Sequence, residues 1–66
     1  MTVQAILDEA LWQVLHDPHI RLGQAVFNIA IERNPSARIL CGTEFDPFYD
    51  DSRVDAFLKK LEEITA

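Results

Sequence analysis

The segment His16-Asp17-Pro18-His19 places two imidazoles and a carboxylate close together, and these residue types can bind zinc. Zinc ligands on helices are usually four residues apart or come from converging segments. The sharp corner that we expect at Asp17-Pro18 separates the two rings. His16 also suits a helix C-terminus, where it interacts favourably with the helix dipole. We therefore predict no metal site and no cofactor.

Cys41 is the single cysteine and a potential nucleophile, but no base adjoins it in the sequence. One thiol and two distant histidines are a weak indication of catalysis. The acidic run from Asp46 to Asp51 lacks the alternating ligands and central glycine of an EF-hand loop. The chain also has no glycine-rich phosphate loop. Because nothing assembles a nucleophile, a base and an oxyanion site, we predict that the protein is not an enzyme.

The residue types that suggest binding are polar side chains on one predicted helix face. Gln24 and Asn28 are four residues apart, so their amides share that face. They either bond to each other, cap the backbone of residues 36–49, or form a recognition strip beside an aromatic turn that carries Tyr49 and Asp50. Because tyrosine is enriched at interfaces, we predict that Gln24, Asn28, Tyr49 and Asp50 form a partner-binding surface.

Arg21 lies in the first turn of the second predicted helix, where the helix dipole disfavours a cation by roughly a few tenths of a kcal/mol. A compensating carboxylate is therefore expected, and Asp50, Asp51 or the nearby Asp17 could supply it. We predict a structural ion pair of Arg21 with Asp50 or Asp51, which would tie the second helix to the start of the third. Contact with a ligand is the alternative role.

Residues 21–28 and 45–51 together resemble a signature of a family of short bacterial and phage proteins. That signature is written roughly as R-x-G-Q-x-x-x-N followed by D-x-F-Y-x-x-D, and the resemblance covers residues 18–55 most clearly. It implies a bacterial or prophage origin and supplies no activity.

The chain has 66 residues, of which 48% are hydrophobic, so we expect one small globular domain spanning residues 1–66. A single cysteine excludes an internal disulfide and fits a reducing, cytoplasmic compartment. No apolar run approaches the roughly 20 residues of a membrane span, and we recognise no signal-peptide pattern. The net charge of −5 argues against direct nucleic-acid binding and permits binding to a basic partner surface.

The first predicted helix spans residues 2–16. Its apolar stripe recurs at helical spacing and consists of Val3, Ile6, Leu7, Ala10, Leu11 and Val14. Trp12 lies about 160° from the centre of this stripe, so it is either exposed or covered by another segment. Since tryptophan dominates interface energetics, Trp12 is a further candidate for partner binding.

The second helix is predicted from Pro18 to about Arg33, after an almost loopless corner at Asp17. It is apolar over most of its circumference, which is typical of a central helix. Gly23 costs about 1 kcal/mol relative to alanine in a helix interior, so we expect a close neighbour there. Two opposed apolar faces on so short a chain also predict a two-fold homodimer. The candidate dimer contacts are Trp12, Phe27 and Ile31.

Residues 36–49 are predicted to be a loop, although 37–41 could also be an extended segment or a helical turn. Its aromatic residues Phe45, Phe48 and Tyr49 are expected to fold back as a hydrophobic lid. The third helix is predicted over residues 53–65, with Ser52 or Asp51 as its cap.

The sequence therefore predicts an all-α fold, a compact three-helix domain with an irregular aromatic and acidic lid. We predict a non-enzymatic protein–protein interaction module, such as a small bacterial or prophage regulator or accessory protein without membrane contact. The alternative is an acidic decoy that occupies the nucleic-acid-binding surface of a partner. Salt separates the two, because a decoy should lose affinity steeply as the ionic strength rises.

Overall fold

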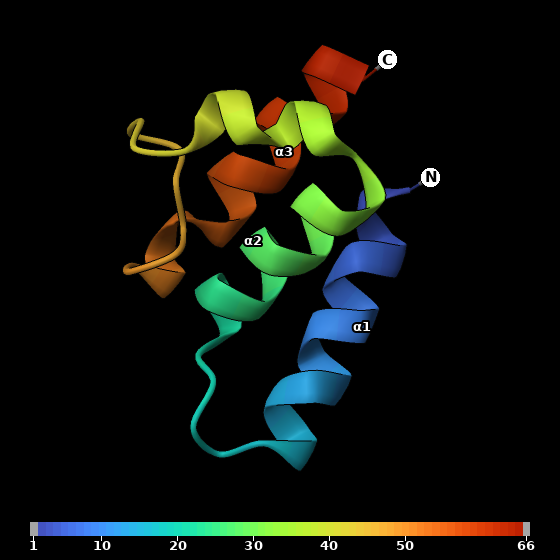
Figure 1. Cartoon of the computed structure of the whole chain (residues 1–66), viewed down its shortest axis with the longest axis vertical. Coiled ribbons are helices and arrows are strands. Elements are labelled where there is room, and N and C mark those ends of the chain that lie inside the picture. Colours follow the sequence, from blue (N-terminus) through green and yellow to red (C-terminus); the bar gives the residue numbers. More distant parts are fainter. Residues whose placement is uncertain (1, 66) are drawn as a thin grey trace.

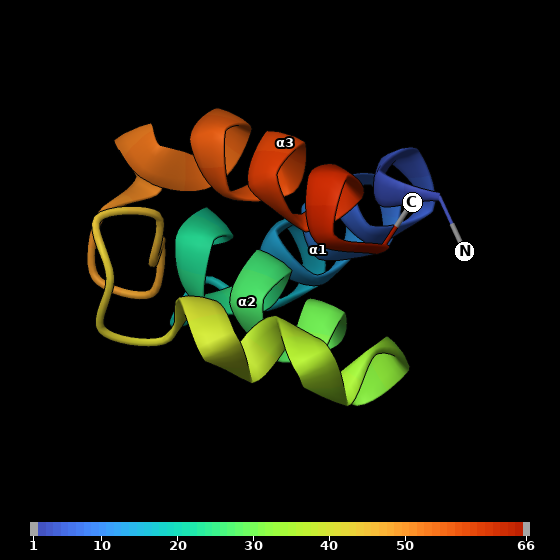
Figure 2. The same cartoon turned by 90° about the horizontal axis from the view of Figure 1, so that it is seen from above.

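The computed structural model describes residues 2–65, and within that range the chain is all-α with no strand. Its elements are α1 (Val3–His16), α2 (Leu22–Arg33), the 3₁₀ helices η1 (Pro35–Leu40) and η2 (Asp51–Arg53), and α3 (Val54–Thr65). Helix α1 runs alongside α2 (Figure 1). Seen from above, α2 lies between α3 and η1 (Figure 2). The predicted all-α architecture with three longer helices is confirmed.

Helix α1 begins where the sequence predicts it. The Thr2 hydroxyl accepts a hydrogen bond from the Ala5 amide, which satisfies one of the unpaired amides at the helix start. Ile6 and Ala10 are fully buried, as the stripe predicts. Leu11 is a correction, because it lies at the edge of the stripe and is 48% exposed.

The corner between α1 and α2 is longer than predicted. Asp17 ends α1, its backbone amide donating to the Gln13 carbonyl, and its carboxylate accepts from the His19 amide at 3.0 Å. Asp-Pro at this position thus forms a turn, a common role for this pair, rather than starting a helix. Helix α2 therefore begins at Leu22 and not at Pro18.

Helix α2 is the central helix of the fold, as predicted. Other elements of the same chain cover both of its apolar faces. Helices α1 and η1 pack against α2, and so do η2 and α3. Its buried residues are Gly23, Ala25, Val26, Phe27, Ile29 and Ala30. Phe27 is only 6% exposed and contacts the rings of Phe48 and Phe57. The two opposed faces of α2 consequently leave no large apolar area for a second copy.

The segment after α2 is more regular than predicted. Residues 35–40 form η1, which starts at Pro35 and is capped by the Asn34 side chain accepting from the Ser36 amide. Pro at the first helical position and Asn before it both favour the start of a helix. These two residues explain why this segment is helical and not the predicted loop. Residues 41–50 are turns.

The aromatic lid is formed in part. Phe45 and Phe48 are half-buried and pack against the core, and Pro47 between them is fully buried. Tyr49 is 81% exposed, so it lies outside the lid.

Helix α3 presents a narrow apolar stripe to the core, comprising Val54, Phe57, Leu58 and Leu61. It is preceded by η2, and the cap is Asp50, whose carboxylate accepts from the Ser52 amide at 3.0 Å. The predicted cap at Ser52 or Asp51 is therefore wrong by one or two residues. Within residues 2–65 no helix combines the length and apolar character that crossing a membrane requires.

Candidate functional site

The first half of the candidate site is the junction between the start of α2 and residues 47–51, which we call the α2 junction. A Cβ atom at Gly23 would overlap the carbonyl oxygen of Pro47 and lie 2.9 Å from Oδ1 of Asp51. The predicted close neighbour of Gly23 is thus confirmed. The Gly23 amide donates to Asp51 Oδ1 at 2.9 Å, so a carboxylate distant in sequence caps α2 and complements its dipole.

Arg21 is placed as the residue before α2, in extended backbone, and has no side-chain capping bond. Its Nη2 donates to the Phe48 carbonyl oxygen at 2.9 Å, and its guanidinium carbon lies 6.0 Å from the Tyr49 ring centroid. Within residues 2–65 Arg21 forms no ion pair, so the predicted pair with Asp50 or Asp51 is wrong. Arg21 still ties the start of α2 to the aromatic turn, through a carbonyl instead of a carboxylate.

Three carboxylates of the acidic segment accept hydrogen bonds from backbone amides of that segment or of α2. Asp46 accepts from the Gly42 and Phe48 amides, Asp51 accepts from Gly23, and Asp50 accepts from Ser52. Hydrogen bonds from the hydroxyl and amide of Ser52, helped by the charges of Arg53 and Arg21, lower the pKa of the Asp50 carboxyl. These bonds account for the acidic residues as structural caps.

A shallow cavity of about 430 Å³ opens beside this segment. It is lined by Gly42, Thr43, Asp46, Tyr49, Asp50 and Arg53. Asp50 is paired with Arg53 at 3.4 Å, and both oxygens of Asp46 already accept amide bonds. The carboxylates in the cavity are therefore engaged, and its Tyr49 ring is the most accessible contact.

Gln24 and Asn28 lie on α2, half-buried and exposed respectively. Within the part of the chain that the structure describes, neither side-chain amide makes a hydrogen bond to a protein atom. The structure thus shows neither the predicted bond between them nor a cap for the 36–49 backbone. Their polar groups remain available to a partner.

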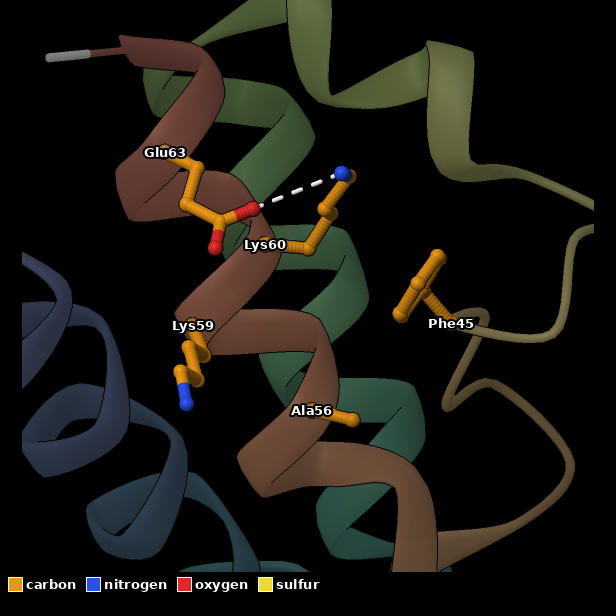
Figure 3. Close-up of a pocket in the computed structure, with 5 residues that line it drawn as sticks. All are labelled: Phe45, Ala56, Lys59, Lys60 and Glu63. Atoms are coloured by element: carbon orange, nitrogen blue, oxygen red, sulfur yellow. Dashed lines mark ion pairs between the residues drawn. The ribbon is translucent and has the colours of Figure 1, made fainter.

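A second, smaller cavity of about 190 Å³ lies between α3 and the turn at Phe45 (Figure 3). Lys60 extends towards the Phe45 ring, with its ammonium 5.5 Å from the centroid, and pairs with Glu63 at 3.3 Å. Both favourable interactions of this ammonium group are thus made within the chain, and the other residues that line the cavity are Ala56 and Lys59.

The second half of the candidate site is the exposed side of α1. Leu11, Trp12 and Leu15 are 48%, 61% and 79% exposed, and we call these three residues the α1 outer face. Trp12 stacks on the ring of His16 with 4.1 Å between centroids, and His16 Nδ1 donates to the Trp12 carbonyl oxygen. Neither the lid nor α3 covers the indole.

The structure therefore places the residues predicted for partner binding in separate parts of the fold. Tyr49 and Asp50 border the α2 junction together with Arg21. Gln24 and Asn28 lie on α2, and Trp12 lies on the outer face of α1. Leu15 was missed by the sequence analysis, although its position four residues after Leu11 and three after Trp12 places all three on neighbouring parts of one helix surface.

Among residues 2–65 no group of three or more His, Cys, Asp or Glu side chains is placed to hold a metal ion. Cys41 is an exposed thiol. Every buried side-chain nitrogen or oxygen within the same range has a hydrogen-bond partner, so no unpaired polar group points into a cavity.

Comparison with known proteins finds no matching family model, no curated protein with significant sequence similarity and no solved structure with a significant match.

Proposed function

We propose that this protein is a non-enzymatic protein–protein interaction module that binds its partner through the α1 outer face. The observation that carries the proposal is the exposure of Leu11, Trp12 and Leu15 within five consecutive residues of one helix. Contiguous apolar surface is costly to leave in water, and on small proteins it commonly marks a binding site. Trp12 is the natural anchor, because tryptophan is enriched among the residues that dominate binding energy.

The burial pattern supports this proposal over a purely structural explanation. Ile6 and Ala10, on the opposite side of α1, already attach the helix to the core and are fully buried. None of the three outer residues belongs to the core or is among the hydrophobic residues packed against it, so packing in the core does not explain them.

A second contact region is proposed at Gln24, Asn28, Tyr49 and Asp50. The two amides have no partner within residues 2–65, and Tyr49 is 81% exposed. These residues could widen the contact or bind separately, and the variants below distinguish the two arrangements.

The acidic decoy remains the alternative function, supported by the net charge of −5. We favour the interaction module, because the acidic residues Asp46, Asp50 and Asp51 have structural reasons for their positions. A bacterial or prophage origin is supported by the resemblance of the signature at residues 21–28 and 45–51, and a cytoplasmic location by the single exposed cysteine.

The test is affinity capture from the native host, read by mass spectrometry, with variants that keep the fold. Trp12→Ala and Leu15→Ser should lose the captured protein while circular dichroism stays unchanged. Gln24→Ala, Asn28→Ala and Tyr49→Ala test the second region in the same way. Undiminished capture by both α1 variants would contradict the proposed site. Capture that disappears with moderate salt, but not with Trp12→Ala, would favour the decoy.

The predicted homodimer is the competing use of this face, and the same measurements address it. Of its predicted contacts only Trp12 is well exposed, since Phe27 is buried and Ile31 is half-buried. Any two-fold contact would therefore use the α1 outer face, and Trp12→Ala should shift the sedimentation equilibrium towards the monomer.

A further inference from the structure

The acidic and basic residues of α1 and of the turn after it have one sign. Residues 2–20 contain Asp8, Glu9 and Asp17 and no lysine or arginine. Asp8 is exposed one turn before Leu11 and Trp12, with its carboxylate held by the Gln4 amide at 2.9 Å. Asp17 follows the last residue of α1. Asp8 therefore lies on the same side of α1 as the apolar face, and Asp17 lies in the turn beyond the C-terminal end of that face.

Two details sharpen this charge pattern. Glu9 is paired with Arg33 of α2 and so is largely neutralised, which leaves Asp8 as the free carboxylate on that side of the helix. The C-terminal end of α1, beside Asp17, also carries the negative end of the helix dipole. A bound cation would therefore be favoured at both ends of the face.

Trp12 offers a further contact for a cation. One face of its indole is stacked on His16, and the side chain is 61% exposed. Arginine or lysine over the open face of an indole is attracted by the negative charge of the ring face. The face therefore combines an apolar centre with nearby carboxylates and an aromatic ring suited to a cation.

We infer that the partner of the α1 outer face is a basic amphipathic helix. Its apolar stripe packs on Leu11, Trp12 and Leu15, and its lysine or arginine residues lie opposite Asp8 and Asp17. A second copy of this chain is a poorer occupant, because it would bring the same carboxylates and a further net charge of −5 to the contact. This inference rests on the proposed function and specifies the partner of that site.

The test uses Trp12 as its own reporter, because it is the only tryptophan in the chain. The probe is a synthetic helical peptide of about 14 residues, about 21 Å long, with leucine along one stripe and lysine elsewhere. Binding should shift the Trp12 emission to shorter wavelength. A peptide with glutamate in place of lysine, and one with the leucine–lysine sequence scrambled, should each leave the emission unchanged.

Variants then separate the two components of recognition. Asp8→Asn combined with Asp17→Asn should weaken binding of the leucine–lysine peptide roughly fivefold. The matched pair Glu44→Gln with Glu62→Gln removes two exposed carboxylates elsewhere and should change the affinity little. Leu15→Ser should weaken binding roughly tenfold through lost apolar contact.

Three outcomes would overturn the inference. The first is an unchanged emission spectrum with the leucine–lysine peptide, and the second is an equal response to the glutamate or scrambled peptide. The third is a blue shift of the protein alone as its concentration rises, which would assign the face to a second copy. If the peptide fails while Trp12→Ala and Leu15→Ser still lose the host partner, the proposed function stands and only the partner chemistry is wrong.

Discussion

The α2 junction and the α1 outer face differ in what their residues do for the fold. At the junction, Gly23 admits the Pro47 carbonyl, Asp51 caps α2 and Arg21 reaches the Phe48 carbonyl. On the outer face, Leu11 and Leu15 are exposed large apolar residues without a comparable role. The junction contains the unusual residue types, and the outer face contains ordinary ones.

This contrast changes where function should be sought. An unusual residue pattern attracts attention in a sequence, yet here glycine, arginine and aspartate are explained by one close contact between distant segments. Leucine and tryptophan are unremarkable in a helix, but their exposure has no structural benefit. Residues that the fold does not need are the better candidates for binding.

Among variants at the α2 junction, the largest expected effect is that of Gly23→Ala. In an open helix the change would stabilise the protein by about 1 kcal/mol. Here the added methyl group overlaps Pro47, so we expect a net loss of about 2 kcal/mol in the free energy of unfolding. Urea denaturation measures it, against a total of roughly 3–5 kcal/mol for a domain of this size. A stabilised variant would show that the junction is looser than described.

Asp51→Ala should destabilise by about 1 kcal/mol, the usual cost of losing a helix cap. Asp51→Asn is the matched control, because its amide oxygen still accepts from Gly23, and it should lose less. The measurement is the same denaturation curve. If the two variants are equally destabilised, the charge and not the hydrogen bond stabilises the start of α2.

Arg21→Ala should cost about 0.5–1 kcal/mol through loss of the bond to the Phe48 carbonyl. Arg21→Lys should recover part of it, since an ammonium can still donate to that oxygen. If Arg21→Ala leaves the melting temperature unchanged, Arg21 does not stabilise the fold and becomes a candidate binding residue.

Asp50 should make a small, pH-dependent contribution. Its pKa is lower in the folded chain than its ordinary value of 3.8, so the carboxylate stabilises the fold above that value. The stabilisation is lost as the pH falls through the folded pKa. Melting temperatures of wild type and Asp50→Asn should therefore differ at neutral pH and converge in acid. Curves that stay parallel would contradict this linkage.

The smallest effect on stability is expected on the α1 outer face. Leu15→Ser should change the free energy of unfolding by less than about 0.5 kcal/mol, as exposed substitutions usually do. The buried counterpart Ile6→Ala should cost about 2–5 kcal/mol. A large loss in Leu15→Ser would show that the outer face contributes to folding.

The three longer helices and the central position of α2 were predictable from the amino-acid pattern. Helical periodicity and cap residues act over three or four positions, so they can be read directly from the chain. The sequence also indicated that Gly23 has a close neighbour, because glycine destabilises a helix interior and is expected there only where a larger residue does not fit. The start of α2 was missed because Asp17-Pro18 suits both a turn and a helix start, and only the packing of α1 against α2 selects the turn.

Which side chains meet across the fold depends on how distant segments pack. Asp51 caps a helix 28 residues earlier in the chain, and Arg21 finds a carbonyl where a carboxylate was expected. Such pairings depend on how separate segments pack, and no local pattern encodes them. For the same reason, the sequence could not determine whether Trp12 is exposed. The residue pattern of one helix shows which side is apolar, but only the arrangement of the neighbouring elements determines which side is covered.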